Sequence, residues 1–210
     1  DTTAPTVTLT DTDSDNVVNV SQVVTITAGF SEVMTATPTI SITGIVTSVI
    51  MTPVSGTNSY TYTWDTSSGT LSDGAYFATV SGTDLIGNAY VAGTQSITFT
   101  VDSSTPTVSI TTNDSDNTIK PGDNLIVTVT FNEAMASSPR ITIGSIVNNI
   151  ALTAVNSSTY TYSWSPSGIS EGTYTVTVTG TDLAGNNYAG TESVTITFDS
   201  TLPSVILGDS

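Results

Sequence analysis

The sequence contains neither cysteine nor histidine, and only two of its residues are basic. Without cysteine the fold cannot depend on disulfides, and without either residue a zinc or copper site lacks its favoured ligands. A nucleic acid backbone needs several basic side chains to neutralise it, and Lys120 and Arg140 are too few. Attraction to anionic lipid is excluded for the same reason. We therefore expect neither nucleic acid nor an anionic membrane as a partner.

Long apolar runs are also missing. Hydrophobic residues make up 37% of the chain, but they form short runs, and none approaches the roughly 20 residues of a membrane-spanning helix. The first residues do not resemble a signal peptide, as we expect of a segment from a longer protein. A glycine-rich phosphate loop and a nucleophile-elbow serine are absent as well, so we expect no enzymatic activity.

Acidic residues dominate the charge that is present. There are 18 Asp and Glu, which give a formal net charge of −16. Such a chain either repels itself or recruits cations. Threonine and serine mostly alternate with Val, Ile, Phe and Tyr, which is the pattern of half-buried strands. Little lysine with much Thr, Ser, Asn and Gly is typical of an extracellular, cell-surface protein of a prokaryote.

One motif occurs three times, as Asp1-Thr-Thr-Ala-Pro5, Asp102-Ser-Ser-Thr-Pro106 and Asp199-Ser-Thr-Leu-Pro203. The copies begin about 100 residues apart, which is the size of a small sandwich domain. We therefore predict a first repeat at residues 1–101, a second at 102–198 and the start of a third at 199–210.

The two repeats align almost without gaps, and their shared pattern predicts seven short strands in each. The clearest pair is Tyr60-Thr-Tyr-Thr-Trp64 and Tyr160-Thr-Tyr-Ser-Trp164, where aromatic residues recur at the two-residue period of a strand. The spacing of Leu71 and Tyr76 resembles the tyrosine corner of immunoglobulin-like sandwiches. We predict an all-β chain of two tandem, seven-stranded, antiparallel immunoglobulin-like β-sandwiches arranged end to end.

Most acidic residues fall in the predicted turns. If seven strands run up and down, the start of each repeat and its second, fourth and sixth turns lie at one pole, and the other turns lie at the opposite pole. Stacked repeats then gather acidic residues where one follows the next. The middle junction would collect Asp11, Asp13, Asp15, Asp73, Asp102, Glu133 and Asp182, with neutral oxygens from Asn16 and Asn186. The outer poles would hold Asp1, Glu32 and Asp84 at the start, and Asp114, Asp116, Asp123 and Glu171 at the end.

This crowding predicts a bound cation. Two carboxylates about 4 Å apart repel by roughly 4 kcal/mol at an effective dielectric constant of about 20. Calcium prefers six to eight oxygen ligands of the kind these turns provide. A plainer alternative stays open for single loops, because residues 13–16 could form a solvated turn in which Asp and Asn bond to their own backbone. That loop is not an EF-hand, since Asn16 and Gln22 stand where Gly and Glu are required.

Three motifs recur in both repeats. They are Phe30-Ser-Glu-Val-Met34 with Phe131-Asn-Glu-Ala-Met135, Gly82-Thr-Asp-Leu-Ile-Gly-Asn88 with Gly180-Thr-Asp-Leu-Ala-Gly-Asn186, and the Asp102-Ser-Ser-Thr-Pro106 linker. Together they resemble the bacterial immunoglobulin-like repeats of large cell-surface adhesins and biofilm-associated proteins. The resemblance implies an extended stalk between a cell-anchored end and a ligand-binding end, with calcium at the junctions to stiffen it.

The resemblance also implies which residues bind calcium. By position it selects Asp102, Glu133, Asp182 and Asn186 at the middle junction, and Asp1, Glu32, Asp84 and Asn88 at the first. In the more variable loops we favour Asp13 and Asp15 over Asp11, because the second repeat has Thr112 where the first has Asp11. The remaining candidate ligands are Asp73, Asp114, Asp116, Glu171 and Asp199.

We therefore expect a structural spacer, a stalk segment of a long prokaryotic surface adhesin that calcium makes rigid. Its partners would be neighbouring repeats of the same chain. Two alternatives remain: a segment of a surface layer or extracellular filament, and an adhesive domain that binds glycan, ice or another cell.

Overall fold

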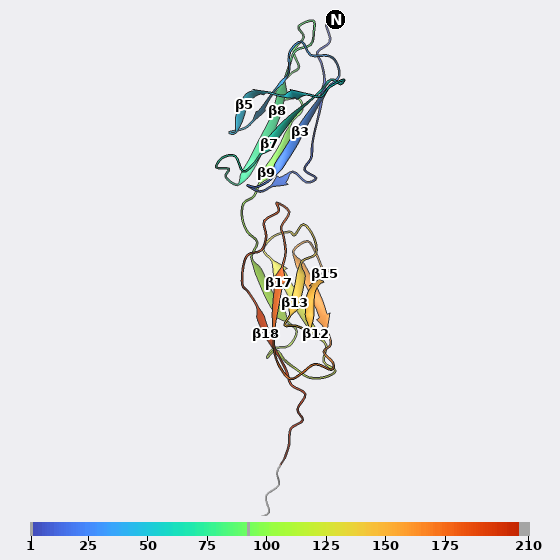
Figure 1. The fold of residues 1–210 in the computed structure, drawn as a ribbon, viewed down its shortest axis with the longest axis vertical. Helices are drawn as coiled ribbons and strands as arrows, with labels where there is room; N and C mark the ends of the chain where they lie inside the picture. Colours follow the sequence, from blue (N-terminus) through green and yellow to red (C-terminus); the bar gives the residue numbers. More distant parts are fainter. Residues whose placement is uncertain (1, 92, 206–210) are drawn as a thin grey trace, which may run out of the picture. The chain divides into compact units, whose positions relative to one another are not determined.

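The computed structural model describes residues 2–91 and 93–205. The chain divides into two compact units, Asp1–Ser104 and Thr105–Ser210. Every regular element of the described residues is a β-strand (Figure 1). Among these residues there is no helix long and apolar enough to cross a membrane. The predicted fold class, all-β with two sandwich domains, is confirmed.

The first unit packs two sheets, with strand orders β1-β3-β7-β6 and β2-β9-β8-β4-β5. Its strands are β1 (Val7–Asp11), β2 (Val17–Val18), β3 (Val23–Phe30), β4 (Thr39–Ile42), β5 (Val46–Ile50), β6 (Thr52–Pro53), β7 (Ser59–Asp65), β8 (Gly74–Ser81) and β9 (Ile97–Val101).

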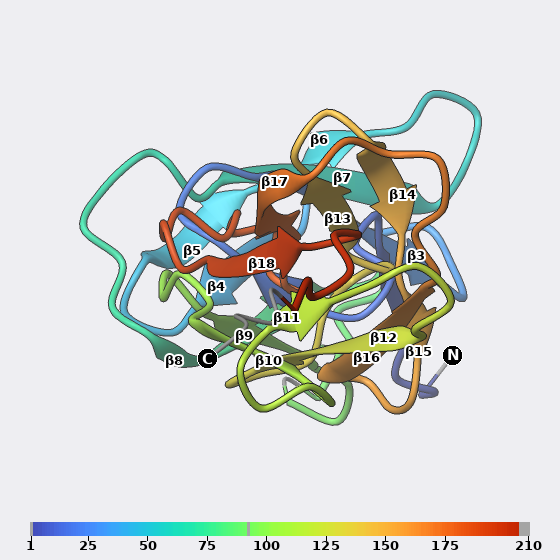
Figure 2. The same cartoon turned by 90° about the horizontal axis from the view of Figure 1, so that it is seen from below.

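The second unit repeats this topology, with strand orders β10-β12-β16-β15 and β11-β18-β17-β13-β14. Its strands are β10 (Val108–Thr112), β11 (Thr118–Ile119), β12 (Leu125–Phe131), β13 (Arg140–Ile143), β14 (Val147–Ala151), β15 (Thr153–Ala154), β16 (Thr159–Trp164), β17 (Gly172–Thr179) and β18 (Val194–Phe198). The neighbouring strands β10, β12 and β16 also lie side by side in Figure 2.

Each unit contains nine strand segments where seven strands were predicted, because the first and the fourth strand each divide between the two sheets. The sequence predicted only the first segment of the first strand. In the first unit β1 pairs antiparallel with β3, whereas β2 pairs parallel with β9. The predicted loop at residues 13–16 separates these two segments, and Asn16 takes a left-handed φ of 60° there, which asparagine tolerates. A second crossing separates β5 from β6 at Met51, whose side chain is buried.

Alternation of apolar and polar residues builds each core. Along β3, every second residue from Val24 to Phe30 is buried, and the residues between them lie at least partly in solvent. The aromatic residues of the facing sheets meet inside, where the rings of Trp64 and Phe99 are 5.4 Å apart between centroids. The aromatic residues that recur along β7 and β16 therefore belong to the cores.

Strand pairing defines two poles in each unit. In the first unit Val7 pairs with Phe30 and Thr39 with Ser81, so the turns that follow β3 and β8 lie beside the start of the chain. We call this end the N-terminal pole. At the other end Gly74 pairs with Val101, which places the loop before β8 at the end of β9. This is the C-terminal pole, and both poles agree with the up-and-down arrangement predicted from the sequence.

The predicted tyrosine corner is present in both units. The Tyr76 hydroxyl donates to the Ser72 carbonyl at 2.9 Å, and the Tyr174 hydroxyl donates to the Ser170 carbonyl at 2.6 Å. Each bond ties the loop before a strand to that strand, and Tyr174 also stacks edge to face on Trp164 with ring centroids 6.2 Å apart.

We expect Tyr174→Phe to lower the free energy of unfolding by about 1 kcal/mol, because it removes one hydroxyl and keeps the ring. Urea titration of the native chain and the variant measures this difference. Thr175→Ser, at an exposed position of the same strand, is the control and should change little. An unchanged midpoint for Tyr174→Phe would show that the corner is not stabilising.

Candidate metal centre

Two carboxylates meet at the N-terminal pole of the second unit. Glu133 lies in the turn after β12, and Asp182 lies in the turn after β17. An isolated β-bridge between Met135 and Asp182 joins the two turns. One carboxylate oxygen of Glu133 and one of Asp182 are within 4.8 Å of each other. Asp182 is buried, with 1% of its surface exposed, so this pair is partly withdrawn from water.

The turn after β17 wraps the Asp182 carboxylate. Its Oδ1 accepts a hydrogen bond from the Asn186 backbone N–H at 2.8 Å, and its Oδ2 accepts one from the Asn186 side-chain amide at 2.9 Å. Gly185 takes a φ of 90°, a left-handed conformation that closes the turn and favours glycine. A carboxylate offers about four acceptor positions, so a carboxylate held in this way can also coordinate a cation.

The first unit repeats this arrangement. Asp84 is buried, and its Oδ1 accepts hydrogen bonds from the backbone N–H groups of Ile86, Gly87 and Asn88 at 2.7 to 2.9 Å. Burial alone would raise the pKa of Asp84, but the bonds from the Asn88 side chain and from these backbone groups hold its pKa below the usual value of 3.8. Glu32 lies half-buried in the turn after β3. Asp1, the third predicted ligand at this pole, lies outside the described residues.

The linker aspartate is held by its backbone and by its side chain. The Asp102 N–H donates to the Val18 carbonyl at 2.9 Å, and Asp102 Oδ1 accepts the Ser104 N–H at 2.9 Å. Asp199 repeats both contacts with Ile119 and Thr201, at 3.0 and 2.8 Å. Both aspartates therefore begin the following linker in the same local conformation.

The start of the second unit is tied to the neighbour of Glu133. The Thr107 N–H donates to Asn132 Oδ1 at 2.7 Å, and the Asn132 N–H donates to the Thr107 carbonyl at 3.1 Å. The chain therefore enters this unit beside the turn that carries Glu133.

Asp73 and Glu171 bind the residues that follow the linker aspartates. Asp73 accepts hydrogen bonds from Ser103 and Ser104, and Glu171 accepts them from Ser200 and Thr201. Side-chain hydrogen bonds from Ser103 lower the pKa of Asp73, and those from Thr201 and Ser200 lower the pKa of Glu171. The sequence predicted these two residues as calcium ligands, and it gave no role to the hydroxyl residues. The sequence feature that could have revealed these contacts is the pair of hydroxyl residues that follows each linker aspartate.

The acidic loops between the two segments of the first strand bond to their own backbone. Asp13 Oδ1 accepts the N–H groups of Asp15 and Asn16 at 3.1 and 2.6 Å. In the second unit Asp114 and Asp116 both accept the Thr118 N–H, at 3.3 and 2.9 Å. These are the contacts of the plainer alternative, a solvated turn, while calcium binding by Asp13, Asp15, Asp114 and Asp116 stays a prediction.

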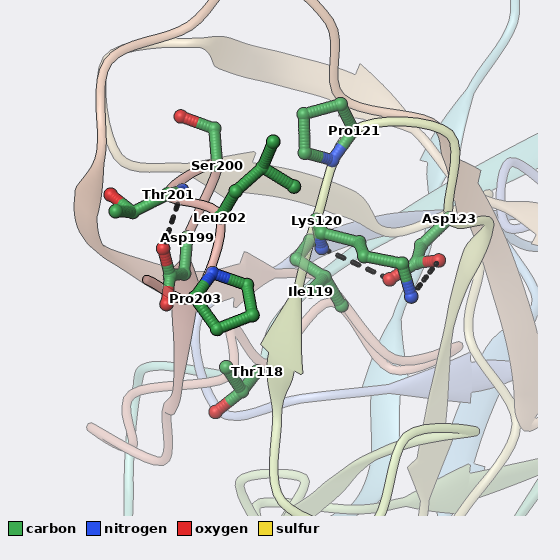
Figure 3. A pocket seen from close by; sticks show the side chains of 10 residues that line it. All are labelled: Thr118, Ile119, Lys120, Pro121, Asp123, Asp199, Ser200, Thr201, Leu202 and Pro203. Atoms are coloured by element: carbon green, nitrogen blue, oxygen red, sulfur yellow. Dashed lines mark hydrogen bonds and ion pairs between the residues drawn. The ribbon is translucent and has the colours of Figure 1, made fainter. Parts of the chain in front are cut away.

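Figure 3 shows the C-terminal pole of the second unit, where the outgoing segment 199–203 and the turn 118–123 line a groove. Lys120 forms an ion pair with Asp123 at this turn, with nitrogen and oxygen 3.5 Å apart. The other basic residue, Arg140, donates to the Asn149 carbonyl at 2.6 Å. Both basic side chains thus have partners of their own, Asp123 for Lys120 and the Asn149 carbonyl for Arg140.

One of the solved structures that align with this chain supports the sandwich fold. A structure of a 1.5-MDa bacterial ice-binding adhesin, studied for its retention at the host cell surface, aligns with a TM-score of 0.50 and 21% identity, over 96% of this chain and 67% of that one. The adhesin InvE of Yersinia pseudotuberculosis aligns at 16% identity and a TM-score of 0.34, over 93% of this chain and 58% of that one. No curated protein matches the sequence.

The family assignment comes from the sequence itself. The family model of the bacterial Ig-like domain (group 3) matches residues 58–195 and 158–210, which together cover most of the chain. This assignment agrees with the two sandwiches, the tyrosine corners and the recurring turn motifs described above. The chain belongs to the bacterial Ig-like domain family, group 3.

Proposed function

We propose that this chain is a spacer segment of a long prokaryotic surface adhesin, and that calcium bound where one repeat follows another makes the segment rigid. The observation that carries the proposal is the paired carboxylates of Glu133 and Asp182, held by two turns whose motifs recur in both repeats. Two buried or half-buried carboxylates at this separation repel each other, and a cation bound between them would offset that repulsion. Carboxylate oxygens are the ligands that calcium prefers.

We propose Asp102 as the third carboxylate of this site. Thr107 is fixed beside Asn132, next to Glu133. Thr107 is five positions after Asp102, and an extended chain spans at most about 3.6 Å per position, so Asp102 is tethered within about 18 Å of Thr107. Calcium needs six to eight oxygen ligands, and backbone carbonyls and water would supply the others. Asp1, Glu32 and Asp84 would form the same set in the first repeat.

The ion would act mechanically. Bound to a linker carboxylate and to two carboxylates of the following repeat, it would join groups that the chain otherwise connects only through a short linker. Rotation about that linker would then break ligand bonds, so the ion would restrict the motion of one repeat relative to the next. A stalk needs this restriction at every junction, which fits a site whose residues recur in each repeat.

An adhesive surface has weaker support. Thr173, Thr175, Thr177 and Thr179 form an exposed row on β17, which could present hydroxyl groups to a ligand. The aligned residues of β8 are Ala75, Phe77, Thr79 and Ser81, so the row is not repeated in the first unit. The acidic turns, by contrast, occur in both units. A spacer function shared by all repeats explains this repetition better than an adhesive surface on one unit does.

Small-angle X-ray scattering with and without calcium tests the spacer. In millimolar calcium we expect a narrow distance distribution with a larger maximum dimension, because fixed junctions keep repeats extended. In excess chelator the distribution should broaden. Magnesium serves as the control, since it demands octahedral geometry and holds its water tightly, and it should reproduce little of the effect. Identical scattering in calcium and chelator would contradict the proposal.

A further inference from the structure

A carboxylate at the C-terminal pole of the first unit holds the first residues of the outgoing linker. Asp73 Oδ1 accepts the Ser103 N–H at 2.8 Å and the Ser103 hydroxyl at 2.6 Å, and Asp73 Oδ2 accepts the Ser104 hydroxyl at 3.1 Å. Asp73 lies in the loop before β8, about 30 residues earlier in the chain, so these are tertiary contacts. We call Asp73, Ser103 and Ser104 the linker clamp.

The second unit builds the same clamp from different residues. Glu171 Oε1 accepts the Ser200 N–H at 3.1 Å, the Ser200 hydroxyl at 2.7 Å and the Thr201 hydroxyl at 2.6 Å. The loop between the tryptophan of the preceding strand and this acidic residue is shorter in the second repeat, and glutamate is longer than aspartate. The same linker contacts are therefore kept although the loop and the side chain both differ.

The clamp adjoins the linker aspartate on its C-terminal side. The Asp102 backbone N–H is fixed to Val18, and Asp102 Oδ1 is fixed by the N–H of Ser104. Ser104 is in turn held through its hydroxyl by Asp73. The clamp thus limits the conformations of the residue that orients the Asp102 carboxylate.

We propose that Asp73 is a positioning residue, which fixes the outgoing linker through Ser103 and Ser104 and so presents the Asp102 carboxylate for calcium. This inference rests on the proposed calcium site and goes beyond it, because it assigns Asp73 an indirect role. A ligand that is held in place before the ion arrives loses less conformational freedom on binding. Replacing a residue that holds a metal ligand in place typically weakens metal binding by about 10 to 100-fold.

The rival role for Asp73 is direct coordination of calcium, as the sequence predicted. The two roles make opposite predictions for the hydroxyl groups. If Asp73 coordinates the ion, Ser103→Ala with Ser104→Ala removes competing donors and leaves calcium affinity equal or higher. If Asp73 positions the linker, the same double variant weakens calcium binding as Asp73→Ala does.

Isothermal titration calorimetry with calcium chloride measures these affinities on the whole chain. We expect Asp73→Ala and the double serine variant each to weaken calcium binding by about tenfold. The three substitutions together should weaken calcium binding no further than Asp73→Ala alone, because all of them break the same set of hydrogen bonds. One variant that also removes an exposed acidic charge serves as the control. Asp65 lies at the same pole, but its carboxylate bonds to Ser67 of its own turn, so Asp65→Ala should leave the affinity unchanged.

A readout without calcium separates positioning from general damage to the fold. In chelator, amide hydrogen exchange at Ser103 should be faster in Asp73→Ala than in the native chain, while exchange within β8 and β9 stays the same. Native calcium affinity in Asp73→Ala, with binding intact in the native chain, would overturn the clamp but leave the proposed function standing. Weakening by Asp73→Ala without weakening by the serine variant would also overturn it. No calcium binding by the native chain would overturn both.

Discussion

Glu133→Gln is expected to remove most of the rise in melting temperature that calcium gives the second unit. An ion that binds only the folded state, and whose free concentration is about 100 times its dissociation constant, stabilises that state by about 2.7 kcal/mol. For a unit of this size such a gain raises the melting temperature by about 10 to 20 °C. Glutamine keeps the shape of the side chain and loses the charge that calcium needs. Differential scanning calorimetry in millimolar calcium and in chelator measures the calcium-dependent rise in melting temperature for the native chain and for Glu133→Gln.

The choice of Glu133 matters for this experiment. Asp182 is tied into its turn by Asn186, so replacing Asp182 would damage the fold with or without calcium. Glu133 is half-buried in the preceding turn. Asp102→Ala should reproduce the loss, because Asp102 is the proposed linker ligand. If Glu133→Gln lowered the melting temperature equally in chelator, its role would be structural and the metal site would be contradicted.

Residue patterns were sufficient to predict the sandwiches and their poles. Alternation along β3 and the aromatic period of β7 mark buried faces, and the spacing of Leu71 and Tyr76 marks a corner that the structure contains. The turn order then followed from the strand count alone. These features are local or periodic, so they can be recognised in a single sequence without knowledge of distant contacts.

The split strands could not be predicted in the same way. β2 and β11 each have two residues, too few to show a period, and both pair in parallel with the last strand of their unit. Their position is set by contacts with residues far away in the sequence. The edge strands β5 and β14 contain Ser48 and Asn149 with φ values of 50° and 55°, and the register of each shifts against its partner strand. Asparagine tolerates this conformation, but serine at the equivalent position of the first repeat gives no such signal.

The acidic residues illustrate the same limit at the candidate site. Composition and turn order indicated that carboxylates gather at the poles, but they could not show which carboxylates already have hydrogen-bond partners. Asp13 bonds to backbone within its own loop, whereas Asp73 bonds to hydroxyl groups about 30 residues away. The difference depends on side-chain direction, which the sequence pattern does not encode. For this reason the clamp emerged only from the structure.

Phe99→Ala is expected to cause the largest loss of stability of any substitution considered, and to confine that loss to the first unit. Phe99 is completely buried in the first core and packs edge to face against Trp64. Removing a buried phenylalanine ring typically costs about 3 to 5 kcal/mol, which is a large part of the roughly 5 to 15 kcal/mol that stabilises a domain. The melting temperature of the first unit should fall by at least about 12 °C.

Phe77→Ala is the matched control, because Phe77 lies on the neighbouring strand β8 but is 46% exposed and points away from the core. We expect it to shift the melting temperature by a few degrees at most. The aligned residue of the second unit, Ile196, lies in a separate core, so the transition of that unit should stay in place in both variants. Thermal unfolding in chelator, followed by calorimetry, removes any contribution from calcium. A common shift of both transitions in Phe99→Ala would mean that the two units unfold as one, because a cavity in one core can lower the stability of the other only if their unfolding is coupled.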